Sequence, residues 1–442
     1  MPIRGMYHGP VNSHSLWIFH ADGIFGSGNT GCNDARGGFV DGKPSNGKVH
    51  SKLARGTVRR TDPGARGRCN WQHNGLSKPG GDMNGTRLRV GIVGTGLVAQ
   101  VMHLPHLQSL PNLYEIVALC DLSERTAQTL ARRYGVPHAF TDIGDMLDTV
   151  ELDAALILTP YHYPQVMAAL SAGVHVFVEK PMCVNVEEAT DMVEAARRNG
   201  LIGQLGYHKP YDPGYETGAA MVRAMSVVRM ATMYVAHGPN EPFLEHYEIL
   251  RGDDADPDRV AATGRAMRTA QQQAIGEQPE HVARAYGGLL GSGCHQLSIM
   301  RGCLGRVEDV LSTEIWNGGR SIAATLKFER GVRCVFTAVF MPDIRLFDET
   351  FTACDDGSST AIRFPSPFLK HAPTMVIHRG MEDGRYVERE ITTDYREAFR
   401  NELIHFHRSI TTGTPPRTPL EHGAEDAATM IAIVRNCPDF VA

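Results

Sequence analysis

Apolar and polar residues follow one pattern in the first half of the chain beyond residue 86 and another in the second half. In the first half, short continuous apolar runs alternate with stretches of helical periodicity, as in parallel strand–helix–strand units. Strands are predicted at Arg87–Ile92, Tyr114–Cys120, Asp153–Leu158 and His175–Val178, and helices at about Leu97–Leu110, Ser123–Tyr134 and Pro164–Ala172. The sequence therefore predicts a doubly wound parallel sheet, with Pro105 kinking or interrupting the first helix.

The second half begins after a predicted helix at Val186–Asn199, and its apolar and polar positions alternate over short runs. This alternation is typical of an antiparallel sheet with one covered face. Such strands are predicted near Val227–His237, Ser321–Phe328, Val332–Val339 and Phe347–Ala353, and two closing helices at Tyr395–Thr411 and Leu420–Asn436. The expected fold class is α/β, with a doubly wound parallel sheet followed by an α/β domain that has a large, mainly antiparallel open sheet.

The first 85 residues differ in composition from the rest of the chain. They contain 17 of the 46 glycines, no glutamate and a net charge of +6, whereas the whole chain carries −5. Their apolar residues form short unpatterned clusters, which cannot offset the entropy cost of ordering the chain. We expect a disordered extension over 1–85, a first domain over 86–206 and a second over 207–442, whose last helices can pack back on the first. A basic interaction arm is the alternative for residues 1–85.

Length and composition narrow the class of protein. With 442 residues and 42% hydrophobic content, the chain is long enough for two or three globular domains. The net charge gives no reason to expect a nucleic-acid or anionic-membrane partner, and no apolar run approaches the ~20 residues that span a bilayer. The nine cysteines are scattered without a C-x-x-C pair, which indicates reduced cytoplasmic thiols rather than a disulfide framework, and no metal site is expected.

A glycine-rich turn joins the first predicted strand to the helix that follows it. Gly94-Thr95-Gly96-Leu97-Val98-Ala99 has the pattern G-x-G-x-x-A, whose first glycine allows a tight turn and whose second lets backbone amides approach a pyrophosphate. Asp121 lies 25 residues after Gly96 at the next strand end, where a carboxylate accepts hydrogen bonds from ribose hydroxyls and repels a 2′-phosphate. The turn predicts NAD in preference to NADP, although Arg125 could reverse that preference; a tight turn that binds no phosphate is the alternative. The expected cofactor contacts here are Gly94, Thr95, Gly96, Leu97, Val98, Asp121, Leu122 and Arg125.

Glu179-Lys180-Pro181 follows the predicted strand His175–Val178. Ligands of an open parallel sheet bind beyond the carboxyl ends of the strands, so Lys180 is predicted to face the cofactor crevice. A lysine there can hydrogen-bond a substrate hydroxyl, stabilise a developing alkoxide or pass a proton. A Lys-Pro pair at a strand end is by itself more often structural, but its position 84 residues after Gly96 makes the catalytic interpretation more specific.

The combination of these motifs with Thr159-Pro160 resembles the Gfo/Idh/MocA oxidoreductases, which include glucose-fructose oxidoreductases and inositol dehydrogenases. The resemblance extends from about Arg87 to Cys437. It implies an N-terminal Rossmann domain, a C-terminal α/β domain whose open sheet often forms oligomer contacts, and hydride transfer between a nicotinamide and a sugar or polyol carbon. A homodimer or homotetramer is expected on this basis. The resemblance adds Thr159, Pro160, His162, Glu179 and Lys180 to the expected cofactor contacts.

The resemblance also implies two catalytic residues. Lys180 matches the lysine of the family's Glu-Lys-Pro motif, and His295 matches the histidine of its D-x-G-x-H motif. In the family pattern the histidine takes the proton of the hydroxyl being oxidised, while the lysine holds that hydroxyl. Gly291 stands in place of the family's aspartate and Ser298 in place of another acidic residue, which leaves the proton handling open. A histidine that is merely packed in a helix is the alternative for His295.

The expected substrate contacts lie at two predicted strand-to-loop junctions and beside His295. The family often has Thr-Pro-Asn-x-x-His where this chain continues from Thr159-Pro160 with Tyr161-His162, and Pro210 replaces the arginine of a later turn. Aromatic faces and polar tips suit a sugar ring, which has apolar faces and a rim of hydroxyls. The candidates are Tyr161, His162, Tyr207, His208, Lys209 and Cys294, the last as a contact rather than as a nucleophile or metal ligand.

The polar stretch Arg251–Ala285 precedes His295 and is predicted to be helical. A substrate lid, an oligomer contact and a solvated surface insertion are all compatible with its composition.

Three functions compete on these observations. The leading one is an NAD(P)-dependent dehydrogenase or reductase acting on a CH–OH group of a sugar, glycoside or cyclic polyol. The altered motif at Gly291 leaves room for an enzyme that retains NAD and cleaves or eliminates a glycoside. It also leaves room for a non-catalytic regulator that senses NAD or a sugar. Because both Lys180 and His295 are present, the dehydrogenase is favoured.

Overall fold

The computed structural model describes residues 86–442, so the predicted extension over residues 1–85 lies outside the described residues. Six parallel strands form the first sheet in the order β3-β2-β1-β4-β5-β6. They are β1 Leu88–Val93, β2 Tyr114–Cys120, β3 His138–Phe140, β4 Ala154–Ile157, β5 His175–Val178 and β6 Gly203–Leu205. This is the doubly wound order of a dinucleotide-binding domain, and the predicted parallel sheet is confirmed.

Helices cover both faces of this sheet. Successive residues of a strand point to opposite faces, and in β4 Ala154 and Leu156 join one core cluster while Ala155 and Ile157 join another. Burial on both sides explains why the strands read as continuous apolar runs. The helices of this part are the π-helical turn Ala99–His103, α1 Leu104–Gln108, α2 Glu124–Tyr134, α3 Ile143–Thr149, α4 Tyr163–Ser171 and α5 Val186–Arg198.

The predicted helix Leu97–Leu110 is helical from Leu97 to Gln108, and it is interrupted by a π-helical turn at Ala99–His103. The α-helical pitch resumes in α1, and Pro105 lies in its first turn. Because proline has no N–H, it cannot donate to the carbonyl of the preceding turn, and the π-helical turn lies directly before it. The predicted interruption of this helix is therefore found next to Pro105.

Eight strands form the second sheet in the order β14-β13-β12-β11-β7-β10-β9-β8. Only the β7–β10 pair is parallel, so the prediction of a mainly antiparallel sheet is confirmed. The strands are β7 Met230–His237, β8 Val307–Trp316, β9 Ser321–Phe328, β10 Arg333–Phe340, β11 Phe347–Cys354, β12 Ser358–Phe364, β13 Met375–Glu382 and β14 Arg385–Thr392. The second-half helices are α6 Pro213–Arg223, α7 Glu241–Leu244, α8 Pro257–Ile275, α9 Glu280–Gly288, the π-helical turn Leu289–Gly293, α10 Cys294–Leu304, α11 Ala398–Thr412 and α12 Leu420–Arg435.

Strands β8, β12, β13 and β14 were not predicted from the sequence, and for the two edge strands among them, β8 and β14, there is a physical reason. Strand β14 is exposed along most of its length and carries Arg385, Glu388, Arg389 and Glu390, so its pattern lacks a covered face. Charged side chains on an edge strand discourage pairing with another chain. Strand β8 contains two register shifts against β9, which break the alternation of apolar and polar residues.

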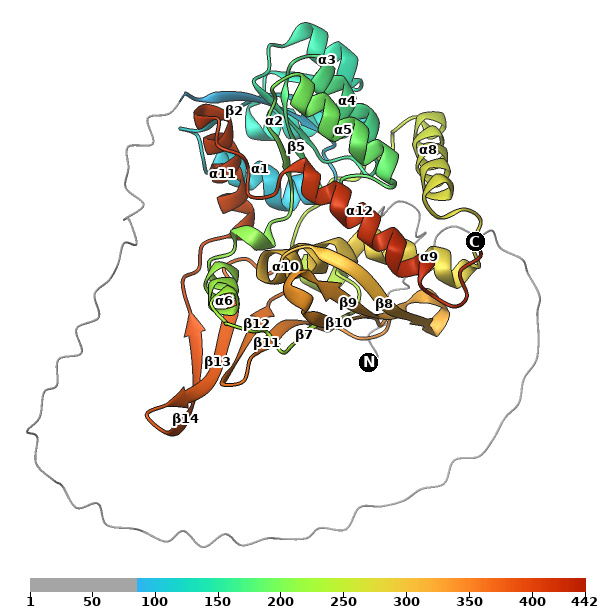
Figure 1. The fold of residues 1–442 in the computed structure, drawn as a ribbon. Coiled ribbons are helices and arrows are strands. Elements are labelled where there is room, and N and C mark those ends of the chain that lie inside the picture. Colours follow the sequence, from blue (N-terminus) through green and yellow to red (C-terminus); the bar gives the residue numbers. More distant parts are fainter. Residues whose placement is uncertain (1–85) are drawn as a thin grey trace, which may run out of the picture. The chain divides into compact units, whose positions relative to one another are not determined.

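Both closing helices return to the first domain. Helix α11 contributes Leu403 and Phe406 to the core cluster that holds Ile92 and Phe177, and it lies beside α1 (Figure 1). The Tyr114 hydroxyl of β2 donates to the Leu403 carbonyl at 2.5 Å. Helix α12 packs against α5. The boundary predicted at residue 206 follows the end of β6 at Leu205, and we keep it as a proposal because these helices tie the two parts together.

No helix within residues 86–442 is long and apolar enough to cross a membrane. In the same part of the chain, no three His, Cys, Asp or Glu side chains are arranged to hold a metal ion.

Candidate functional site

The first glycine of the G-x-G-x-x-A turn is required by the backbone. Gly94 has φ of +91°, and a Cβ there would lie 2.8 Å from the Leu158 carbonyl carbon and the Thr159 nitrogen of the neighbouring strand end. Gly96 differs, because a Cβ at that position would meet no protein atom within 4 Å. The turn therefore leaves open space at Gly96, beside the backbone N–H groups that start the following helix.

Asp121, at the end of β2, is held by the same turn. Its Oδ2 accepts hydrogen bonds from the Thr95 backbone N–H at 2.7 Å and from the Thr95 hydroxyl at 2.9 Å. Its Oδ1 accepts from the Ser123 N–H at 2.9 Å. A carboxylate offers about four lone-pair positions, so capacity remains for a ribose hydroxyl. Thr95 is fully buried and positions Asp121, instead of presenting its own side chain to a cofactor.

The other residues predicted around the cofactor differ in accessibility. Leu97 and Val98 are partly buried and pack against a core cluster that includes Leu244 and Phe399 of the C-terminal domain. Leu122 is half-buried. Arg125 is exposed, and its guanidinium pairs with Asp253 and Asp254, which sequence reasoning did not connect with the cofactor crevice.

Glu179 and His162 lie behind the Glu-Lys-Pro turn. Glu179 is buried, with Oε1 2.7 Å from Nε2 of His103 and Oε2 accepting from the Lys180 N–H at 3.0 Å. His162 Nδ1 lies 2.8 Å from the Pro181 carbonyl oxygen, and burial lowers the pKa of His162 to about 4. Both side chains therefore support the turn, while Thr159 is half-buried and Pro160 exposed at the β4 end.

Lys180 reaches from the end of β5 to the C-terminal domain. Its Nζ donates a hydrogen bond to the Gly291 carbonyl oxygen at 2.9 Å. Gly291 belongs to the π-helical turn Leu289–Gly293, which leads directly into α10 and His295. Turns of this kind are frequent at functional sites. The backbone carbonyl of Gly291 thus holds the lysine at the position where the family pattern has an aspartate side chain.

His295 lies among groups from both domains. Its ring centroid is 5.1 Å from that of His208 and 6.2 Å from that of Tyr207. Burial lowers the pKa of His295 well below its usual 6.5, and the nearby charge of Lys180 lowers it further. Within residues 86–442 its Nδ1 is buried without a hydrogen-bond partner. A neutral imidazole next to a lysine is suited to accept a proton from an alcohol.

His208 is the second histidine of this cluster. Its ring stacks on Phe399 of α11, with centroids 4.4 Å apart and planes 10° from parallel. Burial lowers the pKa of His208 well below 6.5, and the charges of Lys209 and Lys180 contribute. The structure therefore brings Lys180, His208 and His295 together. Phe399 was missed, because its helix lies about 190 residues downstream and no local pattern points to it.

Four other predicted substrate contacts are engaged within the protein. The Tyr161 hydroxyl donates to Glu188 of α5 at 2.5 Å. The Cys294 thiol donates to the Leu290 carbonyl at 3.3 Å, and burial raises its pKa to about 12. Tyr207 is 1% exposed, and burial raises its pKa, with the charge of Asp426 adding to the shift. The fourth, Lys209, is also buried; for these four residues the structure supports packing more than substrate contact.

Lys209 forms a buried ion pair with Glu349 of β11, whose other oxygen accepts from Gln296 Nε2 at 2.6 Å. Burial lowers the pKa of Lys209, and Glu349 opposes that shift. Replacing Lys209 with methionine leaves the Glu349 charge buried without its cation, which should cost about 3 kcal/mol of unfolding free energy. Denaturant unfolding measures this loss, and Lys209→Met/Glu349→Gln should recover most of it. Equal losses in the single and double variants would contradict the pairing argument.

The polar stretch Arg251–Ala285 is largely helical, as predicted, and forms α8 and α9. Helix α9 packs against α12 and β8 of the second domain, and the stretch also contacts the Rossmann domain. Asn185, which caps α5, lies 3.2 Å from Gln273 of α8, and the Arg259 guanidinium donates to the Thr141 carbonyl beyond β3 at 2.9 Å. The stretch is therefore a bridge to the first domain, and the three earlier interpretations, a lid, an oligomer contact and a solvated insertion, did not include this.

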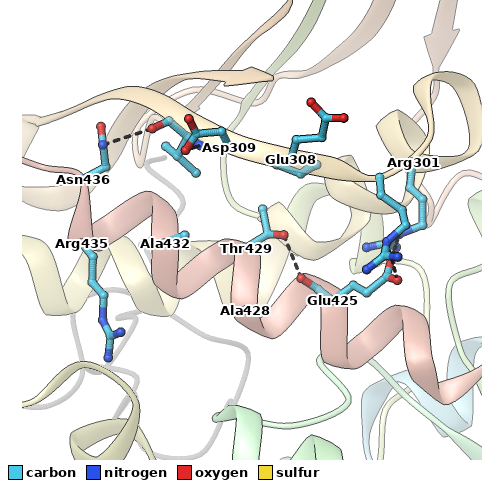
Figure 2. A pocket seen from close by; sticks show the side chains of 12 residues that line it. Arg301, Glu308, Asp309, Glu425, Ala428, Thr429, Ala432, Arg435 and Asn436 are labelled. Atoms are coloured by element: carbon cyan, nitrogen blue, oxygen red, sulfur yellow. Dashed lines mark hydrogen bonds and ion pairs between the residues drawn. The ribbon is translucent and has the colours of Figure 1, made fainter. Parts of the chain in front are cut away.

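A cavity of about 550 Å³ lies elsewhere, between edge strand β8 and helix α12 (Figure 2). Three of its charged residues pair with one another, since Glu425 accepts from Arg301 at 3.1 Å and from Arg306 at 3.0 Å. Asn436 Nδ2 donates to the Val310 carbonyl at 3.2 Å. None of the residues predicted to bind cofactor or substrate lines this cavity.

Comparison with known proteins finds sequence similarity in the first domain. Residues 88–207 match the family model described as an oxidoreductase family with an NAD-binding Rossmann fold. D-glucoside 3-dehydrogenase of Escherichia coli K12 is 36% identical over 128 residues, which are 28% of this chain and 36% of that protein. Inositol 2-dehydrogenase 3 of Saccharopolyspora erythraea is 31% identical over 172 residues, which are 38% of this chain and 50% of that protein. The matched segments thus span about a third to a half of these relatives.

Solved structures extend the similarity of fold to the second domain. KijD10, a 3-ketoreductase from Actinomadura kijaniata in complex with NADP and TDP-benzene, matches 79% of this chain and 98% of its own at 17% identity, with a TM-score of 0.59. Aldose-aldose oxidoreductase from Caulobacter crescentus matches 79% of this chain and 97% of its own at 20% identity, with a TM-score of 0.61. At these identities the comparison establishes the two-domain fold alone.

Proposed function

Through residues 88–207 the chain belongs to the Gfo/Idh/MocA oxidoreductase family, and on that premise we propose that it is a nicotinamide-dependent dehydrogenase or reductase. The proposed reaction transfers a hydride between the cofactor and a hydroxyl-bearing carbon of a sugar, glycoside or cyclic polyol. The observation that carries this proposal is the convergence of Lys180, His208 and His295 from two domains, fixed by the 2.9 Å contact of Lys180 with Gly291.

The residues of the first domain fit a nicotinamide dinucleotide. Open space at Gly96 accommodates a pyrophosphate near backbone N–H groups, and Asp121 is already oriented by Thr95. The bound nicotinamide supplies the hydride acceptor or donor. Asp121 at the ribose position favours NAD over NADP, because a carboxylate there repels a 2′-phosphate.

Lys180 and His295 divide the proton chemistry between them in this proposal. In the oxidation direction, neutral His295 accepts the hydroxyl proton, and Lys180 donates a hydrogen bond to the oxygen as negative charge develops on it. The Gly291 carbonyl holds Lys180 in place of the missing aspartate. The missing aspartate suggests a glycoside-cleaving enzyme or a sensing regulator as the alternatives, and the experiment below distinguishes them from the dehydrogenase.

The experiment that tests the function is a substrate panel with the purified full-length protein. Pyranosides, their oxidised derivatives and inositols are offered with NAD or NADH, and the change in NADH absorbance is measured. Turnover of at least one carbohydrate supports the proposal. Tight dinucleotide binding without turnover of any carbohydrate would favour the regulator, and glycoside cleavage without net NADH formation would favour the cleaving enzyme.

The two glycines of the turn give a matched prediction. Gly94→Ala forces a side chain into a positive φ and against the Leu158 carbonyl, so it should destabilise the fold by about 1–3 kcal/mol from the backbone conformation alone. At Gly96 a Cβ would meet no protein atom within 4 Å, so Gly96→Val should keep its melting temperature but bind NADH at least about tenfold more weakly. Thermal unfolding and calorimetric titration separate the two effects. Unchanged NADH affinity in Gly96→Val would remove the turn from the cofactor site.

Oligomer formation is part of the proposal. Met230, Tyr234, Leu311, Trp316 and Val335 are each at least 37% exposed, and all lie on strands β7, β8 and β10 of the open sheet. An exposed apolar sheet face supports association of copies as a homodimer or homotetramer. The cytoplasmic location inferred from the scattered cysteines remains a prediction.

A further inference from the structure

Residues Leu250–Asp254, which we name the acidic strap, connect the second domain to the dinucleotide end of the first. The strap lies between α7 and α8 in the chain. The Leu250 N–H donates to Gln100 Oε1 at 2.8 Å, and Gln100 Nε2 donates to the Leu250 carbonyl at 2.9 Å. The same Nε2 donates to the Thr95 carbonyl at 2.8 Å. One glutamine side chain thus fastens the strap to the glycine turn.

The acidic end of the strap docks at the start of α2, just beyond Asp121. Asp254 accepts hydrogen bonds from the Ser123 hydroxyl and from the Arg125 backbone N–H, the latter at 3.0 Å. The Arg125 guanidinium pairs with Asp253 and lies 3.8 Å from Asp254. The fit is close, since a Cβ at Gly252 would lie 2.8 Å from the Ser123 Cβ. The hydrogen bond from Ser123 and that from the Arg125 N–H lower the pKa of Asp254, so the group stays ionised.

A serine hydroxyl, a backbone N–H in the first turn of a helix and a guanidinium form a donor set that suits a phosphate group. These donors follow Asp121 by two to four residues, on the side where the 2′-position of an adenosine ribose is expected. In this chain the carboxylates of the second domain already occupy all three donors. A 2′-phosphate would have to displace Asp254 and would then face Asp121, Asp253 and Asp254 with one arginine.

We propose that Asp254, assisted by Asp253, is a built-in anion at the 2′-phosphate position, through which the second domain selects NAD over NADP. This inference rests on the proposed function and deepens it, because it assigns the selectivity to a segment outside the nucleotide-binding domain. The Asp121 carboxylate repels a 2′-phosphate from one side. On the other side, the strap occupies the hydrogen-bond donors that would otherwise bind that phosphate. Arg125, which by its type alone would favour NADP, is neutralised by the strap.

The test measures the affinities of NADH and NADPH for the full chain by isothermal titration calorimetry, without any substrate. In Asp253→Asn/Asp254→Asn the ratio of the NADPH to the NADH dissociation constant should fall at least about tenfold. Glu248→Gln is the matched control, since it removes one negative charge from the residues just before the strap, where Glu248 pairs with Arg133 at 3.6 Å. It should leave the ratio unchanged.

A third variant separates selectivity from folding. Adding Arg125→Gln to the double variant should reverse the gain in NADPH affinity, because the freed guanidinium is what binds the phosphate. NADH affinity close to that of the wild type shows that each variant is folded. Two results would overturn the strap as the selector while the proposed function stands, provided that the wild type binds NADH. In one, the double variant binds NADPH as weakly as the wild type does. In the other, the double variant gains NADPH affinity and keeps that gain when Arg125 is replaced. If wild type binds neither dinucleotide, the proposed function and this inference both fail.

Discussion

Lys180→Met should reduce turnover by about 10²–10⁴-fold, the usual contribution of a group that assists proton transfer. Methionine keeps the length of the lysine side chain but cannot donate a hydrogen bond, so the oxygen of the alcohol loses its donor and the Gly291 carbonyl loses its contact. Because Lys180 Nζ contacts the Gly291 carbonyl of the second domain and not the glycine turn, NADH affinity should stay within a few-fold of the wild type. Steady-state kinetics with the best carbohydrate of the panel, together with NADH titration, measures both effects.

A matched control distinguishes this role from a general effect of losing a lysine. Lys327→Met removes a lysine on β9 that pairs with Glu308 at 2.9 Å, far along the sheet from the crevice residues. It should leave turnover unchanged. Full activity in Lys180→Met would take Lys180 out of the chemistry, and a loss of NADH binding instead of turnover would assign it to the cofactor.

His295→Asn should produce a loss of similar size, about 10²–10⁴-fold in turnover, because asparagine cannot accept the hydroxyl proton. The pH profile gives a sharper readout than the rate alone. Burial holds the pKa of His295 well below 6.5, so the wild-type kcat/KM in the oxidation direction should stay level as the pH falls through 6.5. The decline should begin only at lower pH, where the ring becomes protonated. His281→Asn, on the surface beside Asp439, is the control and should change neither rate nor profile.

The same pKa has a consequence for stability. An unfolded histidine titrates near 6.5, whereas folded His295 and His208 stay neutral to lower pH. Below pH 6.5 the unfolded chain therefore binds more protons, and stability should fall with falling pH from that point on. Two results would contradict the conclusion that burial keeps His208 and His295 neutral. One is a decline of kcat/KM centred near pH 6.5, and the other is a free energy of unfolding that does not change between pH 7 and 5.

The sequence identified those parts of the site whose chemistry follows from local spacing. Gly94 and Gly96, Asp121 at the next strand end and Lys180 at the end of β5 all follow from one rule, that ligands of a parallel sheet bind at its carboxyl edge. His295 came from the family pattern, and the structure brings it next to His208. The parallel sheet was predicted well for a related reason, since strands buried on both faces have an unmistakable apolar run.

The rest depended on contacts between residues far apart in the chain. Lys209 resembles a substrate contact until Glu349, 140 residues later, is seen to pair with it. The Tyr161 hydroxyl is likewise satisfied by Glu188, 27 residues later, whereas the Cys294 thiol is satisfied locally by the Leu290 carbonyl. The acidic strap carried one local signal, the doublet Asp253-Asp254 after a glycine, but its meaning depends on Ser123 and Arg125, about 130 residues earlier.

The contact between Lys180 and residue 291 is made by a peptide carbonyl, which every amino acid possesses. The position of the Lys180 side chain consequently depends on the backbone conformation at residue 291 and not on which amino acid stands there. Substitutions at residue 291 that preserve the π-helical turn Leu289–Gly293 would leave the hydrogen bond from Lys180 intact. A single deletion between Leu289 and Gly293 would return the segment to α-helical pitch and turn the carbonyl oxygen away from Lys180. Sequence comparison that scores only side chains would count this position as lost, although its main chain still contacts Lys180.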